Sequence, residues 1–313
     1  MLRPFTLHRP QSVEEACALL ARLGEDAAPY AGGTELLLLM KLGLTRPRHL
    51  VDIKRIPGLG DIADAPARSG APSAPPRLTV GATVTHRAVE RSALVRSRCP
   101  LVASVARHVA NVRVRNVGTV GGNLAFADPH SDLATLFLTL DATVELVSPR
   151  GLRGLPLSDF VRGPWDTARQ PDELLTSVHL TPWPGATASA YVKFGVHERP
   201  TLGVAVALQL STSGGRARVA DARVALGCVN PRPARVPAAE ACLTGTTVAE
   251  LDDVLEAAAA LALASADPAD DLHGSADYKR EMVAVFTRRA LRVAATRARG
   301  KESAVGFPHT VVA

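Results

Sequence analysis

Two glycine-rich segments decide the fold expected for this chain: Ala31-Gly32-Gly33-Thr34-Glu35 and Thr119-Val120-Gly121-Gly122-Asn123. Each follows an apolar, strand-like stretch and leads toward a helical pattern, so we expect two turns that each join a strand to a helix. Glycine has no Cβ, so its backbone can pass close to a ligand and present N–H groups to an anion. A helix N-terminus just beyond adds partial positive charge. Two such turns in one domain predict a ligand with two phosphates, held from two sides.

A single glycine pair is most often a simple chain reversal, and that is our interpretation of Gly214-Gly215. The pairing of the two earlier segments favours a functional role for both. The nucleotide-binding patterns G-x-G-x-x-G and G-x-x-x-x-G-K-[ST] are absent from the sequence, as is the G-x-S-x-G pattern of serine hydrolases. The chain therefore offers a phosphate site outside these two patterns and no nucleophile–base arrangement.

The composition is that of a soluble globular protein. The chain has 313 residues, 47% of them apolar and 21% charged, which is enough for two or three packed domains. No apolar run is long enough to span a bilayer, and the N-terminal residues lack an apolar signal core. We therefore expect no transmembrane segment and a cytoplasmic protein.

Cysteine and histidine are too dispersed for a metal centre in this chain. The four cysteines form no C-x-x-C pair, and the nine histidines form no H-x-x-x-H or H-E-x-x-H pair. The net charge is +6, with a basic stretch from Arg87 to Arg115 that contains no aromatic residue. A nucleic-acid surface would need such residues for stacking. A solvated helix face or a docking surface for an acidic partner is the favoured interpretation, and we expect no nucleic-acid partner.

The first part of the chain alternates helical and strand-like patterns. Ser12 and Glu15 form a capping-box pattern that starts a helix, and Gly24 ends it. Thr34 is the expected N-cap of the helix after the first glycine turn, and Asp128-Pro129 is the expected start of a later helix. Further expected elements are strands at 27–30, 49–53, 78–82 and 142–147, helices at 35–42 and within 83–108, and a surface loop at 63–76.

The second part of the chain follows a breaker cluster, Pro182-Trp183-Pro184-Gly185, which is the expected domain boundary. Strand patterns come first and helical patterns follow, an order that favours an α+β domain. The expected strands are 190–194, 203–210 and 217–228, with a hairpin at Gly214-Gly215, and the expected helices are 248–264 and 278–297. We expect domains at 1–180 (subdomains about 1–56 and 57–180) and 185–300, with a tail at 301–313.

The sequence resembles the FAD-binding subunits of the molybdenum hydroxylases, a family that includes the medium subunit of aerobic carbon monoxide dehydrogenase and the flavin domain of xanthine dehydrogenase. The resemblance begins with the two glycine segments. It covers nearly the whole chain in the family's order, through Leu50–Ile53, Arg115–Asn123, Pro171–Leu175, Val229–Arg235 and Ser275–Arg280.

The resemblance implies an α+β fold. It consists of an FAD-binding domain of two α/β subdomains, similar to vanillyl-alcohol oxidase, and a C-terminal domain of antiparallel sheet and helices. It also implies that residues 31–35 and 119–123 surround the FAD pyrophosphate and nearby groups. From its position alone, Asp132 is more simply a helix-dipole carboxylate than a ligand for a hydroxyl group. The resemblance implies instead that Asp132 contacts FAD, and it makes Lys193 a candidate neighbour of the flavin ring, where a cation favours reduced, anionic flavin.

The resemblance implies a non-catalytic electron-transfer subunit in a larger assembly. A large subunit would carry the molybdenum cofactor and a small subunit two [2Fe–2S] clusters, in a dimer of heterotrimers. Electrons would pass from the clusters to FAD here, and then to a quinone, NAD or oxygen. The chain departs from the family pattern at His197–Thr201, which bears on the acceptor. The alternatives are a stand-alone flavin oxidase of the same superfamily and a binding or scaffold protein that has lost its cofactor.

Overall fold

The computed structural model describes residues 2–66, 76–195, 199–302, 306 and 308–313. These residues form two compact units. Unit 1 consists of Met1–Ala127 and Asp141–Thr181, and unit 2 consists of Asp128–Leu140 and Pro182–Ala313. A short segment from the middle of the expected N-terminal domain, which contains Asp132, thus folds with unit 2.

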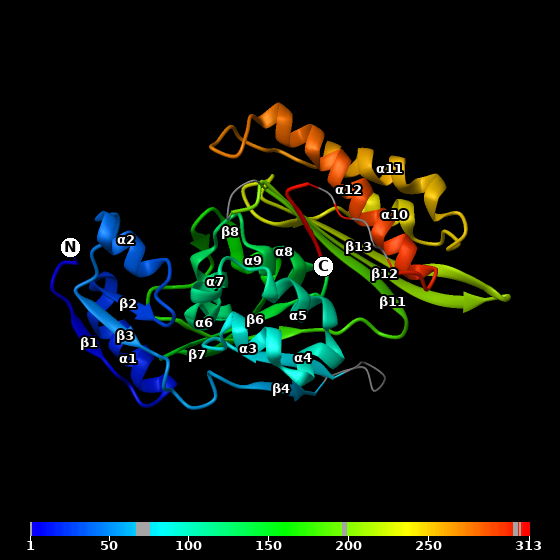
Figure 1. The fold of residues 1–313 in the computed structure, drawn as a ribbon. Helices are drawn as coiled ribbons and strands as arrows, with labels where there is room; N and C mark the ends of the chain where they lie inside the picture. Colours follow the sequence, from blue (N-terminus) through cyan, green and yellow to red (C-terminus); the bar gives the residue numbers. More distant parts are fainter. Residues whose placement is uncertain (1, 67–75, 196–198, 303–305, 307) are drawn as a thin grey trace. The chain divides into compact units, whose positions relative to one another are not determined.

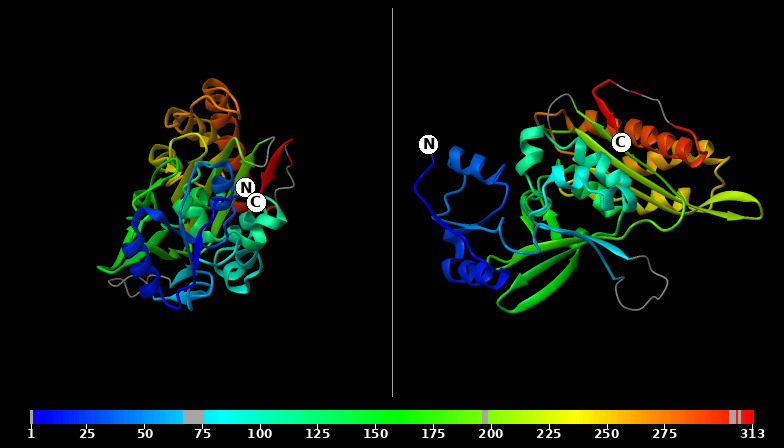
Figure 2. Two further views of the ribbon diagram at one scale, coloured as in Figure 1. Left: turned by 90° about the vertical axis from the view of Figure 1, so that its left-hand side faces the viewer. Right: turned by 60° about the horizontal axis from the view of Figure 1, so that its bottom comes forward.

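Unit 1 begins with a three-stranded parallel sheet of order β1-β3-β2, formed by β1 (Thr6–His8), β2 (Ala27–Tyr30) and β3 (His49–Asp52). Parallel strands need crossover connections. Here α1 (Val13–Leu23), with the short 3₁₀ turn η1 (Gly24–Asp26), and α2 (Leu36–Leu42) provide them, on opposite sides of the sheet (Figures 1 and 2). The predicted start of α1 is confirmed, because Ser12 Oγ accepts a hydrogen bond of 3.1 Å from the Glu15 N–H. Gly24 ends α1, as predicted, with a positive φ of 55°.

A five-stranded antiparallel sheet of order β4-β5-β10-β6-β7 forms the second part of unit 1. Its strands are β4 (Ile62–Ala65), β5 (Arg77–Gly81), β6 (Thr143–Ser148), β7 (Gly151–Pro156) and β10 (Leu174–Leu180). The helices of this part are α3 (His86–Arg91), α4 (Ala93–Arg98), α5 (Pro100–Arg107), α6 (Val112–Val117), α7 (Val120–Phe126) and α9 (Leu157–Phe160). A small hairpin of β8 (Val161–Gly163) and β9 (Asp166–Thr167) follows α9.

The surroundings of the second glycine segment differ from the prediction. The stretch before it is helix α6 and not a strand, because Asn111 Oδ1 accepts hydrogen bonds from the N–H groups of Arg113 and Val114 and thereby starts a helix. Gly121 and Gly122 lie within α7 and not in a turn before it. The helical pattern within 83–108 forms three short helices, since Ser92 caps α4 and Pro100 occupies the first turn of α5.

Two predicted helix starts are wrong. Helix α2 begins at Leu36 with Glu35 at its N-cap position, and Thr34 does not cap it. Asp128 caps no helix: its Oδ1 accepts a hydrogen bond of 2.9 Å from the His130 N–H, a local turn that competes with helix formation. Helix α8 (Asp132–Leu138) begins after Ser131, whose Oγ accepts from the Ala134 N–H. The loop predicted at 63–76 starts inside β4, and its residues 67–75 lie outside the described residues.

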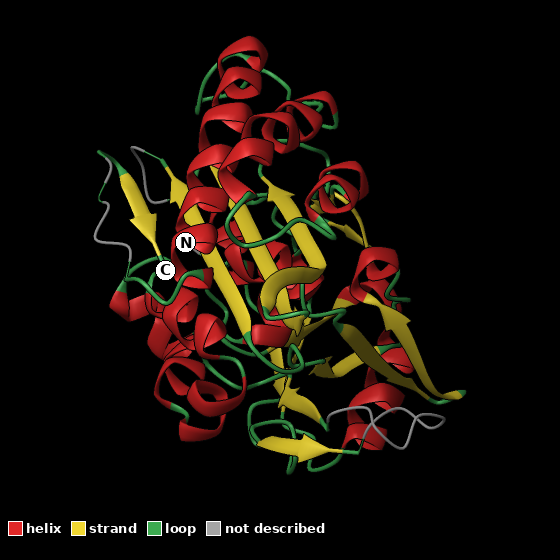
Figure 3. Ribbon diagram, turned by 90° about the vertical axis from the view of Figure 1, so that its right-hand side faces the viewer, coloured by secondary structure: helices red, strands yellow, loops and turns green. Residues whose placement is uncertain are grey.

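Unit 2 is built on a five-stranded antiparallel sheet of order β14-β13-β12-β11-β15. Its strands are β11 (Thr187–Phe194), β12 (Leu202–Ser213), β13 (Arg216–Gly227), β14 (Ala234–Arg235) and β15 (Thr310–Val312). The predicted hairpin is confirmed: Gly214 and Gly215 join β12 to β13 with positive φ at both positions, as a tight turn of the primed type requires. Figure 3 shows the long strands of this sheet with helices of the unit running along them.

The sheet of unit 2 buries both of its faces. Helices α10 (Pro237–Leu243), α11 (Leu251–Ala264) and α12 (Ala276–Ala298) pack over one face, where residues such as Val192, Val204 and Val224 form the core (Figure 1). Side chains alternate between the faces of a strand. Tyr191 and Lys193 therefore point to the opposite face, where α8 packs against β12 and β13. Because of this alternation, Asp132 of α8 contacts both Tyr191 and Lys193 of β11.

Candidate functional site

Within unit 1 the first glycine segment lies against the residues that come just before the second. A Cβ added to Gly32 would lie 2.2 Å from the carbonyl oxygen of Val117 and 2.8 Å from Gly118 Cα. Only a glycine permits this approach, because real Cβ atoms are not found so close to backbone atoms. The first segment therefore rests directly on Val117 and Gly118, the residues that lead into the second segment.

The first glycine segment presents unpaired backbone donors. In the described part of the chain, the N–H groups of Gly32, Gly33 and Thr34 have no hydrogen-bond acceptor. No side chain caps the N-terminus of α2, which begins immediately afterwards. Unpaired N–H groups at the start of a helix form a binding site for an anion. The first segment thus fits a phosphate group.

The second glycine segment is built differently. The Val120 N–H donates to Val84 O, the Gly121 N–H to Ala82 O, and the N–H groups of Gly122 and Asn123 to the side chain and carbonyl of Thr119. Its backbone donors are therefore already paired, and the expectation that both segments present N–H groups holds only for the first. A Cβ on Gly121 would meet Ala82 at 2.5–2.7 Å, so this glycine permits close packing of α7. Gly122 is exposed and remains available for contact with a ligand.

A buried histidine lies beneath this region. His86 is 3% exposed, and a Cβ on Gly118 would lie 3.2 Å from its ring. Burial, assisted by the positive charge of Arg115, lowers the pKa of His86 from 6.5 to about 4. The imidazole is thus neutral at physiological pH, and its Nδ1 has no hydrogen-bond partner among the described residues.

Replacing His86 by leucine should remove part of the pH dependence of stability. The folded pKa of about 4 lies below the ordinary 6.5, so as the pH falls the unfolded state binds the proton first. The free energy of unfolding of the wild-type chain should therefore fall by roughly 3 kcal/mol between pH 6.5 and pH 4, because each pH unit in this interval accounts for about 1.36 kcal/mol. Denaturant unfolding of both proteins at pH 7.5 and pH 4.5 measures it. Equal losses in the two proteins would contradict the prediction.

Asp132 and Lys193, the two other predicted site residues, meet in unit 2. Lys193 Nζ lies 2.7 Å from Asp132 Oδ2, and the Tyr191 hydroxyl donates a 2.9 Å hydrogen bond to Asp132 Oδ1. The side chains of Asp132 and Lys193 are 5% and 12% exposed. Burial and the adjacent carboxylate raise the pKa of Tyr191 well above its ordinary value, so Tyr191 remains a hydrogen-bond donor. Asp132 is thus more than a helix-dipole carboxylate, because it holds Lys193 and Tyr191 in place.

The sequence interpretation assigned no role to Tyr191, although Tyr191 and Lys193 stand two residues apart in one strand. That spacing places both side chains on one face and is the signal that could have found the cluster. The sequence interpretation also missed an ion pair between Arg199 and Asp128, at the start of the segment that carries α8. The sequence departs from the family pattern at His197–Thr201, and His197 lies outside the described residues.

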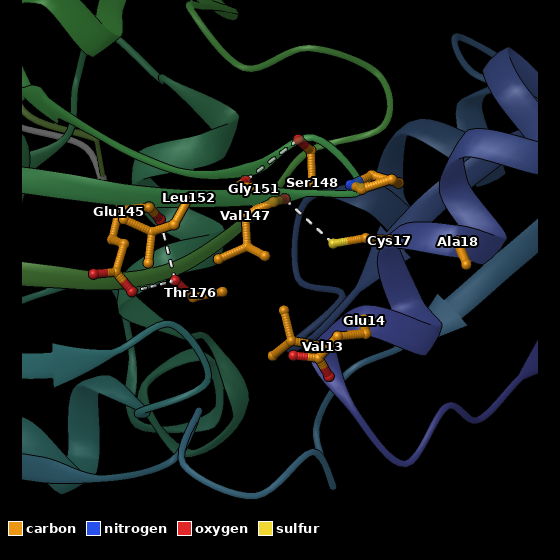
Figure 4. A pocket seen from close by; sticks show the side chains of 11 residues that line it. Val13, Glu14, Cys17, Ala18, Glu145, Val147, Ser148, Gly151, Leu152 and Thr176 are labelled. Atoms are coloured by element: carbon orange, nitrogen blue, oxygen red, sulfur yellow. Dashed lines mark hydrogen bonds between the residues drawn. The ribbon is translucent and has the colours of Figure 1, made fainter.

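A separate groove in unit 1 contains none of the predicted site residues. It has a volume of about 650 Å³ and lies between α1 and the strands β6 and β7 (Figure 4). Cys17 donates a 3.2 Å hydrogen bond to Val147 O, and burial raises the pKa of its thiol to about 11. Glu145 accepts a hydrogen bond of 3.1 Å from the Thr176 hydroxyl. The thiol is protonated at neutral pH, so the groove offers no activated nucleophile.

Among the described residues, no cluster of three or more His, Cys, Asp or Glu side chains is arranged to hold a metal ion. None of their helices combines the length and apolarity needed to cross a bilayer.

Comparison with known proteins gives matches along most of the chain. The family model described as "FAD binding domain in molybdopterin dehydrogenase" matches residues 3–183, and that of the "CO dehydrogenase flavoprotein C-terminal domain" matches residues 195–294. The chain is 35% identical to the carbon monoxide dehydrogenase medium chain of Afipia carboxidovorans, covering 94% of this chain and 98% of that protein. It is 32% identical to the nicotine 6-hydroxylase medium subunit of Paenarthrobacter nicotinovorans, covering 92% and 96%.

Solved structures agree with these matches. The crystal structure of Cu,Mo-CO dehydrogenase in its cyanide-inactivated form contains a chain 35% identical to this one, with a TM-score of 0.85 over 95% of this chain and 99% of that one. Quinoline 2-oxidoreductase from Pseudomonas putida contains a chain 31% identical, with a TM-score of 0.84 over the same shares. The predicted fold class, a two-part FAD-binding domain with an antiparallel C-terminal domain, is confirmed.

Proposed function

The chain belongs to the family of FAD-binding medium subunits of the molybdenum hydroxylases, and we propose that it passes electrons from an iron–sulfur partner subunit, through FAD, to an external acceptor. It is a subunit of a flavin-containing oxidoreductase. The proposed assembly adds a molybdenum-cofactor subunit and a [2Fe–2S] subunit, in a dimer of heterotrimers in the cytoplasm. We also propose that residues 1–180 form the FAD-binding domain and residues 185–300 the C-terminal α+β domain.

One observation carries the cofactor assignment: three consecutive backbone N–H groups, at Gly32, Gly33 and Thr34, are unpaired in the described structure. Phosphate oxygens accept hydrogen bonds only, so a diphosphate satisfies such a row of donors. We propose that residues 31–35 hold the FAD pyrophosphate through the backbone. Residues 119–123 would support that turn and contact FAD through the exposed side of Gly122.

The residues of this chain bind and orient the cofactor, while bound FAD supplies the one- and two-electron chemistry. We propose that Asp132 and Lys193 also contact FAD, as the family resemblance implies. The ion pair between them fixes the ammonium group at one position, and Tyr191 fixes the carboxylate. A positively charged group held in this way stabilises negative charge that develops on a neighbouring molecule.

FAD titration of the purified chain tests the proposal. Binding should raise the unfolding temperature and give the protein a flavin absorption spectrum. The flavin should then be reduced by the organic substrate of the assembly only when the partner subunits are present. A chain that remains colourless and shows no thermal shift would end the proposal. Flavin that stays with the acid-precipitated protein would indicate covalent attachment and support a stand-alone oxidase.

Alanine at Gly121 should destabilise the fold, whereas alanine at Gly122 should act mainly on FAD binding. A Cβ at position 121 would lie 2.5 Å from Ala82 Cβ, an overlap that costs about 1–3 kcal/mol. A Cβ at position 122 would meet only Thr119 Oγ1, and loss of that cap costs about 1 kcal/mol. Urea unfolding and FAD titration of both variants check this. Equal unfolding free energies would refute the packing role of Gly121, and unchanged FAD affinity would remove Gly122 from the site.

A further inference from the structure

The small parallel sheet of unit 1 brings a lysine to the first glycine segment. Strands β2 and β3 run parallel, and their last residues, Tyr30 and Asp52, are paired in register (Figure 1). The chain leaves both strands at the same edge of the sheet, into residues 31–35 after β2 and into Ile53 and Lys54 after β3. Ligands of sheets with parallel strands bind outside the carboxyl ends of the strands. Lys54 therefore lies at the edge where a ligand of the first glycine segment would bind.

The ring of Tyr30 connects Lys54 to the first glycine segment. Lys54 Nζ lies 3.7 Å from the centroid of this ring, over its face. The same ring touches Gly33, since a Cβ added to Gly33 would lie 2.5 Å from Tyr30 Cε2. Gly33 also has a positive φ of 70° and an unpaired N–H group. The ammonium of Lys54 and the backbone of Gly33 thus contact one aromatic ring and belong to one local surface.

Asp52 holds the ammonium of Lys54 in place. Lys54 Nζ lies 2.8 Å from Asp52 Oδ1, and the same oxygen accepts a hydrogen bond of 3.2 Å from the Lys54 N–H. Among the described residues only Asp52 accepts from this ammonium, which has three N–H donors. The side chain of Lys54 is 41% exposed and that of Asp52 is 11% exposed. The ammonium is therefore positioned and accessible, and it neutralises a carboxylate that would repel an anion at this edge.

We propose that the ammonium of Lys54 binds a phosphate group of the FAD diphosphate, beside the backbone N–H groups of residues 32–34. The inference rests on the proposed function, which places the diphosphate at the first glycine segment. Backbone N–H groups carry no net charge, whereas each phosphate group of FAD is an anion. Lysine is a compact point charge that suits such a group. Lys54 thus supplies the countercharge that the backbone of the segment lacks.

Methionine at Lys54 tests the proposal, with Lys41→Met as the matched control. Lys41 is an exposed lysine in the last turn of α2, so each variant removes one positive charge from unit 1. FAD is titrated at low and at high salt concentration. We expect Lys54→Met to lower the affinity for FAD by about tenfold, the contribution of one charge-assisted hydrogen bond. The salt dependence of binding should weaken, because a contact between charges is lost. Lys41→Met should bind FAD as the wild type does, and Lys54→Arg should retain most of the affinity.

Asparagine at Asp52 distinguishes phosphate binding from a purely structural role of the ion pair. Asp52→Asn and Lys54→Met remove the same pair, so a structural role predicts that both lower the affinity for FAD. If Lys54 binds phosphate, Asp52→Asn should leave the affinity unchanged or raise it, because the carboxylate is gone and the ammonium remains. Its binding of FAD should also depend more steeply on salt than that of the wild type. Urea unfolding shows whether each variant is folded.

The outcomes separate this inference from the proposed function. If the wild type binds FAD, and Lys54→Met binds it with the same affinity and salt dependence, the role of Lys54 is overturned and the proposed function stands. An equal loss of affinity in Lys54→Met and Asp52→Asn also overturns that role, because it assigns the pair to the fold. A wild-type chain that binds no FAD refutes the proposed function itself.

Discussion

Valine at Gly32 is expected to lower the affinity of the chain for FAD by about a hundredfold or more. The added Cβ would lie 2.2 Å from Val117 O, an overlap with the backbone that no side-chain rotation relieves. The first glycine segment would have to move off the residues before the second one, and its unpaired N–H groups would move with it. A displacement that costs about 3 kcal/mol of binding free energy corresponds to a factor of about a hundred. FAD titration measures the affinity, and urea unfolding reports the stability.

Gly163→Val is the matched control, because Gly163 lies in the same unit, has no positive φ, and has nothing within 4 Å of the added Cβ. This variant should bind FAD as the wild type does. A Gly32→Val protein that is folded and binds FAD with unchanged affinity would show that the contact between the two segments is not needed for the cofactor. It would leave the unpaired donors of the first segment without an assigned ligand.

Local signals predicted much of the fold. The Ser12 cap, the Gly24 stop and the Gly214-Gly215 hairpin are decided by residues a few positions apart, and all three are confirmed. The central strand β10 was missed, because Leu174–Leu180 acquires its neighbours β5 and β6 from distant parts of the chain. Residues 128–140 pack with unit 2 and not with unit 1. This packing depends on tertiary contacts, which composition does not reveal.

The physical reasons given for the two glycine segments differ from what the structure shows. Both glycine pairs looked like open turns, but only packing distances show that Gly32 and Gly121 face protein atoms. Thr34 looked like a helix cap, and the missing cap instead leaves backbone donors for a ligand. Sequence spacing shows where glycine is required, whereas the partner that requires it comes from elsewhere in the chain.

Asparagine at Asp132 should destabilise the chain by about 3–5 kcal/mol. The variant removes the carboxylate from a buried pair, and the ammonium of Lys193 then remains in a site where it is only 12% exposed. Removing one partner of a buried ion pair costs this much because the remaining charge loses the attraction that offset its desolvation. Replacing both residues, as Asp132→Asn with Lys193→Met, should recover most of the loss, since no charge then remains buried. Urea unfolding of the three proteins gives the free energies.

The same two variants decide whether the pair touches FAD. If Asp132 and Lys193 only stabilise unit 2, the double variant should recover FAD affinity together with stability. If they contact FAD, stability returns while FAD affinity stays low, because the ammonium that Asp132 and Tyr191 hold in position is gone. Recovery of both quantities would refute the proposed contact of Asp132 and Lys193 with FAD. The proposed site would then rest on the first glycine segment. Its hydrogen-bond donors are backbone N–H groups, which replacement of Asp132 and Lys193 does not change.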